Sequence, residues 1–132
     1  MVGARVVTHR HSTDPVAGTI MYAASKAAAT HLGKQFAVEL GPKHITTNTV
    51  SPGFFPSKLA NGLMENLGGV DLLESQNPRK RLGVSDDIGG VMVYLASHAG
   101  NYINGVEIVV DGGGHLKGER KIVEKNAPAA KL

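Results

Sequence analysis

The sequence contains no cysteine, which excludes disulfide bonds, thiol catalysis and cysteine-based zinc sites, and is compatible with a reducing compartment. No apolar run approaches the roughly 18 residues that a membrane-spanning helix needs. Residues 1–5 lack the apolar stretch of a secretory signal, and the chain has no internal repeat. We therefore expect a cytoplasmic protein with no membrane partner.

The chain is long enough for one domain with a core, since 42% of its 132 residues are hydrophobic and 19% are charged. Its formal net charge is +3, and the location of that charge matters because basic patches are typical of nucleic-acid binding. From His115 onward five basic residues face two acidic ones, which accounts for the whole excess. The rest of the chain is neutral, so we expect no nucleic-acid partner. Residues 115–132 are predicted to form a basic, flexible, solvated tail.

Strand and helix patterns alternate along the chain. Three segments have the β-branched composition of strands: residues 4–8, 45–50 and 106–110. Three others have helical patterns: residues 21–40, 57–67 and 85–97. Residues 68–78 are predicted as a loop or a frayed helix. This alternation predicts an α/β fold, in which a parallel sheet of about three strands has flanking helices and an edge that is exposed or covered by a partner.

The boundaries of two predicted helices rest on specific residues. In residues 21–40 apolar side chains recur every fourth position, at Ala24, Ala28, Leu32, Phe36 and Leu40. A Gly-Pro pair then ends the pattern. Ser85 is predicted to cap the helix of residues 85–97, whose first turn contains two aspartates that suit the helix dipole.

Tyr22 and Lys26 are four residues apart, which places a phenol and an ammonium on one face of the predicted helix. A fixed cation beside a phenol favours the phenolate. The pair is therefore a candidate for proton transfer. Because Tyr and Lys at this spacing are also common on exposed helices, the pair alone is a weak signal.

Four ordered segments together carry a specific resemblance. They are Tyr22 to Lys26, the run Asn-Thr-Val-Ser-Pro-Gly at 48–53, the run Arg-Leu-Gly-Val-Ser-Asp-Asp-Ile at 81–88, and the run from Asn104 to Gly113. In this order they resemble the short-chain dehydrogenase/reductase family over residues 4–114. The resemblance implies that residues 1–114 form the C-terminal half of a Rossmann-like, doubly wound parallel sheet. No Gly-rich strand-to-helix turn, which would hold a cofactor pyrophosphate, precedes Tyr22.

The resemblance implies the catalytic roles. Tyr22 would exchange a proton with the hydroxyl or carbonyl oxygen of the substrate, and Lys26 would also bond the nicotinamide ribose. The family serine that bonds the same oxygen would be Ser12, which lies closer to Tyr22 than usual; at the usual gap the residue is His9. Ser12 is favoured, with a shortened loop.

The resemblance also implies the cofactor-binding residues, for either NAD or NADP. The backbone of the loop at Pro52 and Gly53 would hold the nicotinamide amide. Phe55 replaces an aliphatic residue that contacts the nicotinamide, and Ser57 replaces a Thr that bonds the cofactor. Asn48 and the Asp-Gly-Gly run at 111–113 are expected to be structural. No third ligand stands near His9 and His11, so no metal site is expected.

Two functions of different classes remain open. The first is an oxidoreductase that acts on a carbonyl or secondary alcohol, and the sequence at 52–59 looks most like members similar to 3-oxoacyl-carrier-protein reductases. The second is a catalytically inactive truncated chain or an interaction partner of a full-length relative; a third possibility is a misassigned start. Oligomer formation is expected through the helix of residues 21–40, where Ala24, Ala28 and Gly33 would permit close approach.

Overall fold

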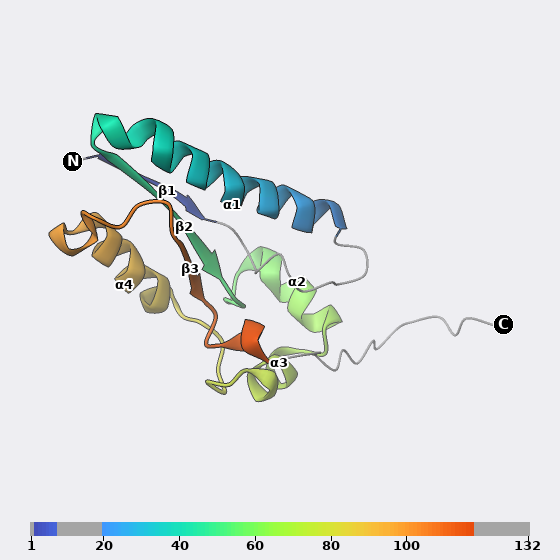
Figure 1. Cartoon of the computed structure of the whole chain (residues 1–132). Helices are drawn as coiled ribbons and strands as arrows, with labels where there is room; N and C mark the ends of the chain where they lie inside the picture. The colour runs from blue at the N-terminus through green and yellow to red at the C-terminus, as the bar shows by residue number, and fades with distance from the viewer. Residues whose placement is uncertain (1, 8–19, 118–132) are drawn as a thin grey trace.

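The computed structural model describes residues 2–7 and 20–117, apart from some side chains, and these contain a parallel three-stranded sheet. The strands are β1 (Val2–Val7), β2 (Ile45–Pro52) and β3 (Glu107–Val110), in the order β1-β2-β3 (Figure 1). Val2 pairs with Ile45 at the start of β1, and Thr49 pairs with Glu107 at the start of β3. The predicted α/β class and parallel sheet are confirmed. Within these described ranges, β1 and β3 each pair with β2 only.

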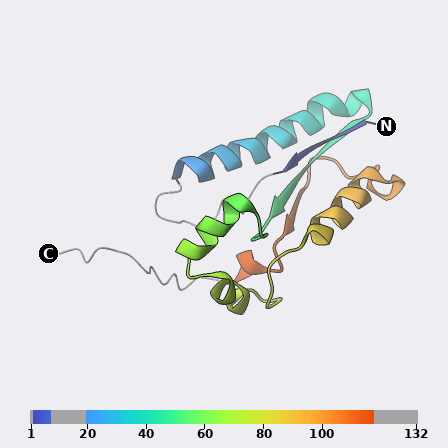
Figure 2. The same ribbon diagram turned by 180° about the vertical axis from the view of Figure 1, so that it is seen from behind.

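Two long helices enclose the sheet. Figures 1 and 2 show α1 (Ile20–Leu40) along one face and α4 (Ser85–Ala96) on the opposite face. The shorter helices α2 (Lys58–Asn66) and α3 (Val70–Gln76) lie beyond the carboxyl ends of the strands. Of the two structures predicted for residues 68–78, the helical one forms as α3. No helix in the described part of the chain is long and apolar enough to cross a membrane.

The face of α1 that was predicted to be apolar is not the face that the sheet buries. Gly33 and Ala37 are the buried residues of α1, whereas Leu32 and Phe36 are 50% and 41% exposed. The buried stripe lies one residue, or about 100°, around the helix from the predicted stripe. An Ala-rich helix has little apolar contrast between its faces, so periodicity alone does not identify the packed one. Gly33, predicted to face a partner, is buried in this chain instead.

The start of α4 also differs from the prediction by one residue. The N-cap is Val84 rather than Ser85, and Val84 has no side-chain oxygen that could cap the helix. The Asp87 side chain accepts a hydrogen bond from the Val84 backbone N–H at 2.8 Å instead. Asp86 and Asp87 do occupy the first turn, as predicted. The carboxylate in the third helical position thus bonds the N–H of the N-cap residue, whereas a capping serine hydroxyl would accept from an N–H of the first helical turn.

A small apolar core lies away from the sheet, between α2, α3 and the chain that leads into α4. Met64, Leu73 and Leu82 are buried there. Phe54 and Leu67 pack against them. This core holds the two short helices in place beyond the carboxyl ends of β2 and β3.

Two asparagines attach β2 to the segment that precedes β3. Asn48 is 2% exposed, donates to the Ile103 carbonyl at 2.9 Å and accepts from the Val106 N–H at 3.3 Å. Asn104 accepts from the Thr47 N–H and donates to the Ala37 carbonyl of α1, each at 2.9 Å. The structural role predicted for Asn48 is confirmed.

Replacing Asn48 with Ala should destabilise the chain by about 1–3 kcal/mol, because it removes the partners of a backbone donor at Val106 and a backbone acceptor at Ile103 in partly buried hydrogen bonds. Urea unfolding followed by circular dichroism measures the change in the free energy of unfolding.

The neighbouring residue Thr47 provides a matched control. Its side chain is fully buried, and its Oγ1 is the one buried side-chain polar atom in the described residues without a hydrogen-bond partner. Thr47→Val should therefore be neutral or stabilising, by about 1 kcal/mol at most. Equal losses of unfolding free energy in both variants would show that the Asn48 hydrogen bonds do not account for the destabilisation.

Candidate functional site

Tyr22 and Lys26 lie together on the first two turns of α1. The Lys26 Nζ atom is 5.4 Å from the centroid of the Tyr22 ring, a distance at which a cation and an aromatic ring attract each other. The Tyr22 side chain is 44% exposed, and Lys26 is half-buried. The structure thus brings the predicted proton-transfer pair together and leaves the tyrosine accessible from solution.

The connection between α1 and β2 places this pair at the carboxyl end of the sheet. A short turn at 41–44 joins the two elements, so α1 runs antiparallel to β2. From Leu40 back to Tyr22 the helix spans about 27 Å, and from Ile45 to Pro52 the strand spans about 23 Å. Tyr22 therefore stands near the level at which β2 ends. The carboxyl edge of a parallel sheet is where ligands of such folds bind.

Pro52 and Gly53 occupy that edge, as predicted. Pro52 is the last residue of β2, and the Gly53 N–H donates to the Val110 carbonyl at the end of β3 at 3.0 Å. A Cβ atom at Gly53 would stand 2.6 Å from the Cβ of Asp111, which is too close for any side chain there. The close approach of the turn after β3 thus requires a glycine at position 53. A ligand bound by the backbone of this loop would be a separate reason for the same residue.

The two remaining residues of the predicted cofactor loop already make contacts within the chain. The Phe55 ring lies against Gly83, where a Cβ atom would come within 2.3 Å of it. The Ser57 Oγ accepts from the Ala60 N–H at 3.0 Å and caps α2. Because a hydroxyl can accept one hydrogen bond and still donate another, this capping leaves the Ser57 hydroxyl hydrogen for a ligand. Ser12 and its alternative His9 lie outside the described residues, so the choice between them stays a prediction.

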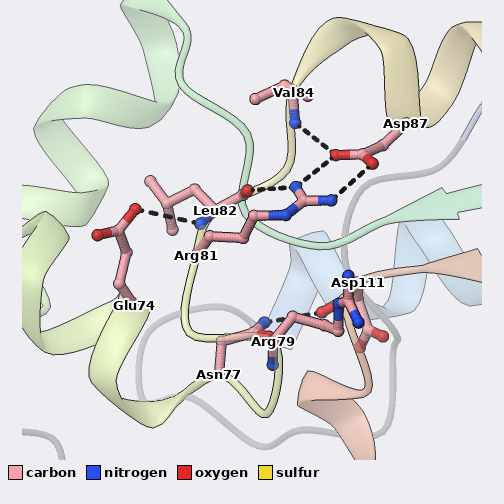
Figure 3. A network of polar contacts seen from close by, with 8 residues as sticks. All are labelled: Glu74, Asn77, Arg79, Arg81, Leu82, Val84, Asp87 and Asp111. Atoms are coloured by element: carbon pink, nitrogen blue, oxygen red, sulfur yellow. Dashed lines mark hydrogen bonds and ion pairs between the residues drawn. The ribbon is translucent and has the colours of Figure 1, made fainter.

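Sequence reasoning missed a polar network beside this loop. Arg81 forms two hydrogen bonds with Asp87, from Nη1 to Oδ2 at 2.6 Å and from Nη2 to Oδ1 at 2.8 Å (Figure 3). The Arg81 Nη1 also donates to the Leu82 carbonyl at 2.9 Å. The signal was present in the run from Arg81 to Ile88, since an arginine six residues before a first-turn aspartate can reach the helix start.

This ion pair changes the proton affinities of both partners. The hydrogen bonds from Arg81, followed by the one from the Val84 N–H, hold the pKa of Asp87 well below its usual 3.8. The same contact raises the pKa of Arg81. The pair fixes the start of α4 against the segment that carries Leu82.

Asp111 organises the turn after β3. Its carboxylate accepts from the Gly113 N–H at 2.9 Å, and from the His115 N–H and Nδ1 at 2.8 Å and 2.9 Å. Partial burial raises the pKa of Asp111, but these hydrogen bonds outweigh it and lower the pKa overall. The Asn77 Nδ2 donates to the Asp111 carbonyl at 2.8 Å (Figure 3). The structural role predicted for this turn is confirmed.

A cavity of about 350 Å³ opens beside the network, between the loop after β2 and the turn after β3. Phe54, Phe55, Arg79 and Asp111 are among its lining residues. It could hold a small polar molecule, whereas a whole dinucleotide would need more room. No group of three or more potential metal ligands occurs in the parts of the chain that the structure describes.

A family model described as enoyl-(acyl carrier protein) reductase matches residues 3–115. Among curated relatives, the chain is 45% identical over 93 residues to the short-chain dehydrogenase/reductase VdtF of Byssochlamys spectabilis, covering 70% of this chain and 30% of the relative. It is 39% identical over 99 residues to 3-oxoacyl-(acyl-carrier-protein) reductase FabG of Staphylococcus epidermidis, covering 75% and 40%. The chain thus spans about a third of the length of these relatives.

Solved structures of larger proteins also match this chain over part of their length. A gluconate 5-dehydrogenase from Burkholderia cenocepacia, in complex with NADP and tartrate, superposes with a TM-score of 0.75 at 28% identity. The match covers 85% of this chain and 45% of that one. The likeness therefore extends over most of this chain but less than half of the larger protein.

The Arg81–Asp87 pair predicts an acid-dependent stability. Because folding lowers the pKa of Asp87 below 3.8, its stabilising contribution is present above about pH 4 and disappears as the pH falls below that. The difference in unfolding free energy between the wild type and Asp87→Asn should therefore shrink from pH 6 to about pH 3. Urea titrations at several pH values measure this difference.

Asp86→Asn is the matched control, because it removes a carboxylate from the same helical turn and Asp86 forms no ion pair within the described residues. The difference in unfolding free energy between Asp86→Asn and the wild type should vary less over the same pH range. A pH-independent difference for Asp87→Asn would contradict the assignment of the low pKa to this pair.

Proposed function

Because the chain belongs to the short-chain dehydrogenase/reductase family, we propose that it is an oxidoreductase that uses NAD or NADP to interconvert a carbonyl and a secondary alcohol. The observation that carries the proposal is the position of the Lys26 ammonium, 5.4 Å from the centre of the accessible Tyr22 ring. That pair stands at the edge of the sheet where the loop of Pro52 and Gly53 also lies. Activity of the whole protein is inferred here, since the chain spans about a third of its relatives.

The described residues suit the nicotinamide end of such a cofactor. The Tyr22 hydroxyl and the Lys26 ammonium can hydrogen-bond a ribose, and the backbone after Gly53 can bond an amide. Ser57 keeps a hydroxyl hydrogen that it can donate. For the pyrophosphate, however, the described ranges contain no Gly-rich turn between a strand and a following α-helix. The described residues therefore fit the nicotinamide half of the cofactor.

The proposed chemistry assigns one task to each side chain. A bound nicotinamide would deliver a hydride to the carbonyl carbon or receive one from the alcohol. Tyr22 would hold the proton that the substrate oxygen gains on reduction and take it back on oxidation. Lys26 would stabilise the tyrosinate left after donation, and Ser12 would donate a hydrogen bond to the same oxygen. A positioned acid of this kind typically contributes about 10²–10⁴ in rate.

The first substrates to test are 3-oxoacyl thioesters, because one relative is named a 3-oxoacyl-(acyl-carrier-protein) reductase and is 39% identical to this chain. The helix α2 follows the loop closely and presents Leu63, which is 45% exposed. An apolar side chain in that position could contact an acyl chain.

A second candidate is a catalytically inactive partner that pairs with a full-length relative or with itself. Exposed apolar side chains on α1 favour it, because Met21 and Val38 are 81% and 73% exposed and Leu32 is 50% exposed. Isolated apolar residues on a surface are ordinary, but several on one helix are typical of an interface. Mixing the chain with a full-length relative and measuring mass by light scattering tests this candidate.

Cofactor binding separates the two candidates. If only the nicotinamide half is held, reduced nicotinamide mononucleotide should bind within roughly threefold of NADH, both with dissociation constants on the order of millimolar. Fluorescence titration of each compound against the 132-residue chain measures this. Absence of binding by either at millimolar concentration would overturn the oxidoreductase proposal for this chain and leave the inactive partner.

Tyr22→Phe should lower any reductase activity by about 10²–10⁴ while leaving nicotinamide binding within a few-fold, because it removes the transferable proton but keeps the ring. Tyr94→Phe is the matched control, since Tyr94 is 43% exposed and lies on α4, on the opposite face of the sheet. Its activity should equal that of the wild type. Reduction that survives Tyr22→Phe would refute the assigned proton donor.

A further inference from the structure

A second cavity, of about 420 Å³, lies between α2, α3 and the segment that leads into α4. Much of its wall is apolar, and the apolar lining residues are Pro56, Met64, Val70, Leu82 and Val84. Met64 and Leu82 belong to the small buried core, whereas Val70 and Val84 are 44% and 53% exposed. The buried core thus continues to the surface here as an apolar hollow.

The charged side chains of this cavity leave it negative. Glu65 and Glu74 line it, together with Arg81. Arg81 is already paired through both terminal nitrogens with Asp87, so its charge is compensated. Glu74 accepts a hydrogen bond from the Leu82 N–H at 3.3 Å. Within residues 2–7 and 20–117, neither glutamate forms an ion pair.

The described chain ends close to this cavity. The Lys117 Nζ donates to the Gln76 carbonyl at 2.9 Å, and Gln76 is the last residue of α3. The same helix contributes two residues to the cavity lining. Lys117, the last described residue, is therefore attached through its side chain to the helix that forms one wall of the cavity.

The sequence after Lys117 contains side chains that complement those lining the cavity. Residues 120–125 read Arg-Lys-Ile-Val-Glu-Lys, so two β-branched apolar residues stand between basic ones. Ile122 and Val123 match an apolar wall. The three basic residues and Glu124 give the segment a net charge of +2, opposite to the two uncompensated carboxylates. We propose that residues 120–125 of the same chain bind in this cavity, with Ile122 and Val123 against the apolar wall and the basic side chains near Glu65 and Glu74.

The distances permit this arrangement. The seven residues of α3 span about 10 Å, and the five residues from Lys117 to Ile122 can extend about 17 Å. A short tether of this kind gives an effective concentration on the order of millimolar, so even a weak contact is occupied. At micromolar protein, residues 120–125 of the same chain therefore outcompete those of a second copy.

Because the chain lacks cysteine, a single nitroxide label can be attached at Asn126→Cys in the full-length chain. The expected result is loss of the amide signals of Val70 and Val84 in the nuclear magnetic resonance spectrum, with the amide of Lys43 at the other end of the sheet unaffected. Adding Ile122→Asp and Val123→Asp should restore the lost signals. The matched control with Ala129→Asp and Ala130→Asp, which adds the same charge, should not restore them.

Two outcomes would overturn the proposal. The first is that the signals of Val70 and Val84 keep their full intensity in the labelled chain. The second comes from mixing two preparations, one that carries the nitroxide but no isotope and one that is isotope-enriched but carries no nitroxide. Loss of the Val70 and Val84 signals in that mixture would show that the cavity binds residues of another copy. Restoration by moderate salt would identify the contribution of Glu65 and Glu74 to the contact. None of these readouts depends on cofactor binding or reductase activity.

Discussion

The burial of β2 is the constraint on which the rest of the structure depends. This strand is hydrogen-bonded to a neighbour on each side, and its residues from Thr47 to Pro52 are buried. A strand in that position must satisfy its polar groups within the protein, because unpaired buried donors and acceptors are costly. The Asn48 side chain does so by bonding the backbone between the end of η2 (His98–Gly100) and β3. The Asn104 side chain, from that same segment, accepts from the Thr47 N–H of β2. These bonds fix where β3 starts and therefore its register.

The position of the candidate site follows from the same strand. α1 turns directly into β2, so the direction of β2 determines that the first turn of α1 stands at the carboxyl edge of the sheet. The length of α1 brings Tyr22 and Lys26 to the level of that edge. The loop at Pro52 and Gly53 reaches the same edge because β2 ends there. Two segments that are 30 residues apart in the sequence thus reach the same end of the sheet.

The two short helices beyond the sheet depend on different contacts. Their core of Met64, Leu73 and Leu82 contains no strand residue. The loop at Phe54 links it to the end of β2, and the bond from Asn77 to the Asp111 carbonyl links it to the end of β3. The Gly83 N–H donates to the Phe54 carbonyl at 2.9 Å, which joins the loop after β2 to the start of α4. The cavity between α2 and α3 lies in this part of the molecule.

The sequence by itself determined the fold class, the three strands, the long helices and the pairing of Tyr22 with Lys26, because these depend on local pattern and on spacing within one helix. The tertiary structure decided which face of α1 is buried, since an Ala-rich helix carries too little apolar contrast to specify it. It also decided that Val84 rather than Ser85 precedes α4, because the bond from Arg81 positions Asp87 to accept from the Val84 N–H. The network around Asp111 and the cavity between α2 and α3 likewise require side chains from distant segments. Such contacts arise only when segments that are distant in the sequence are placed next to one another.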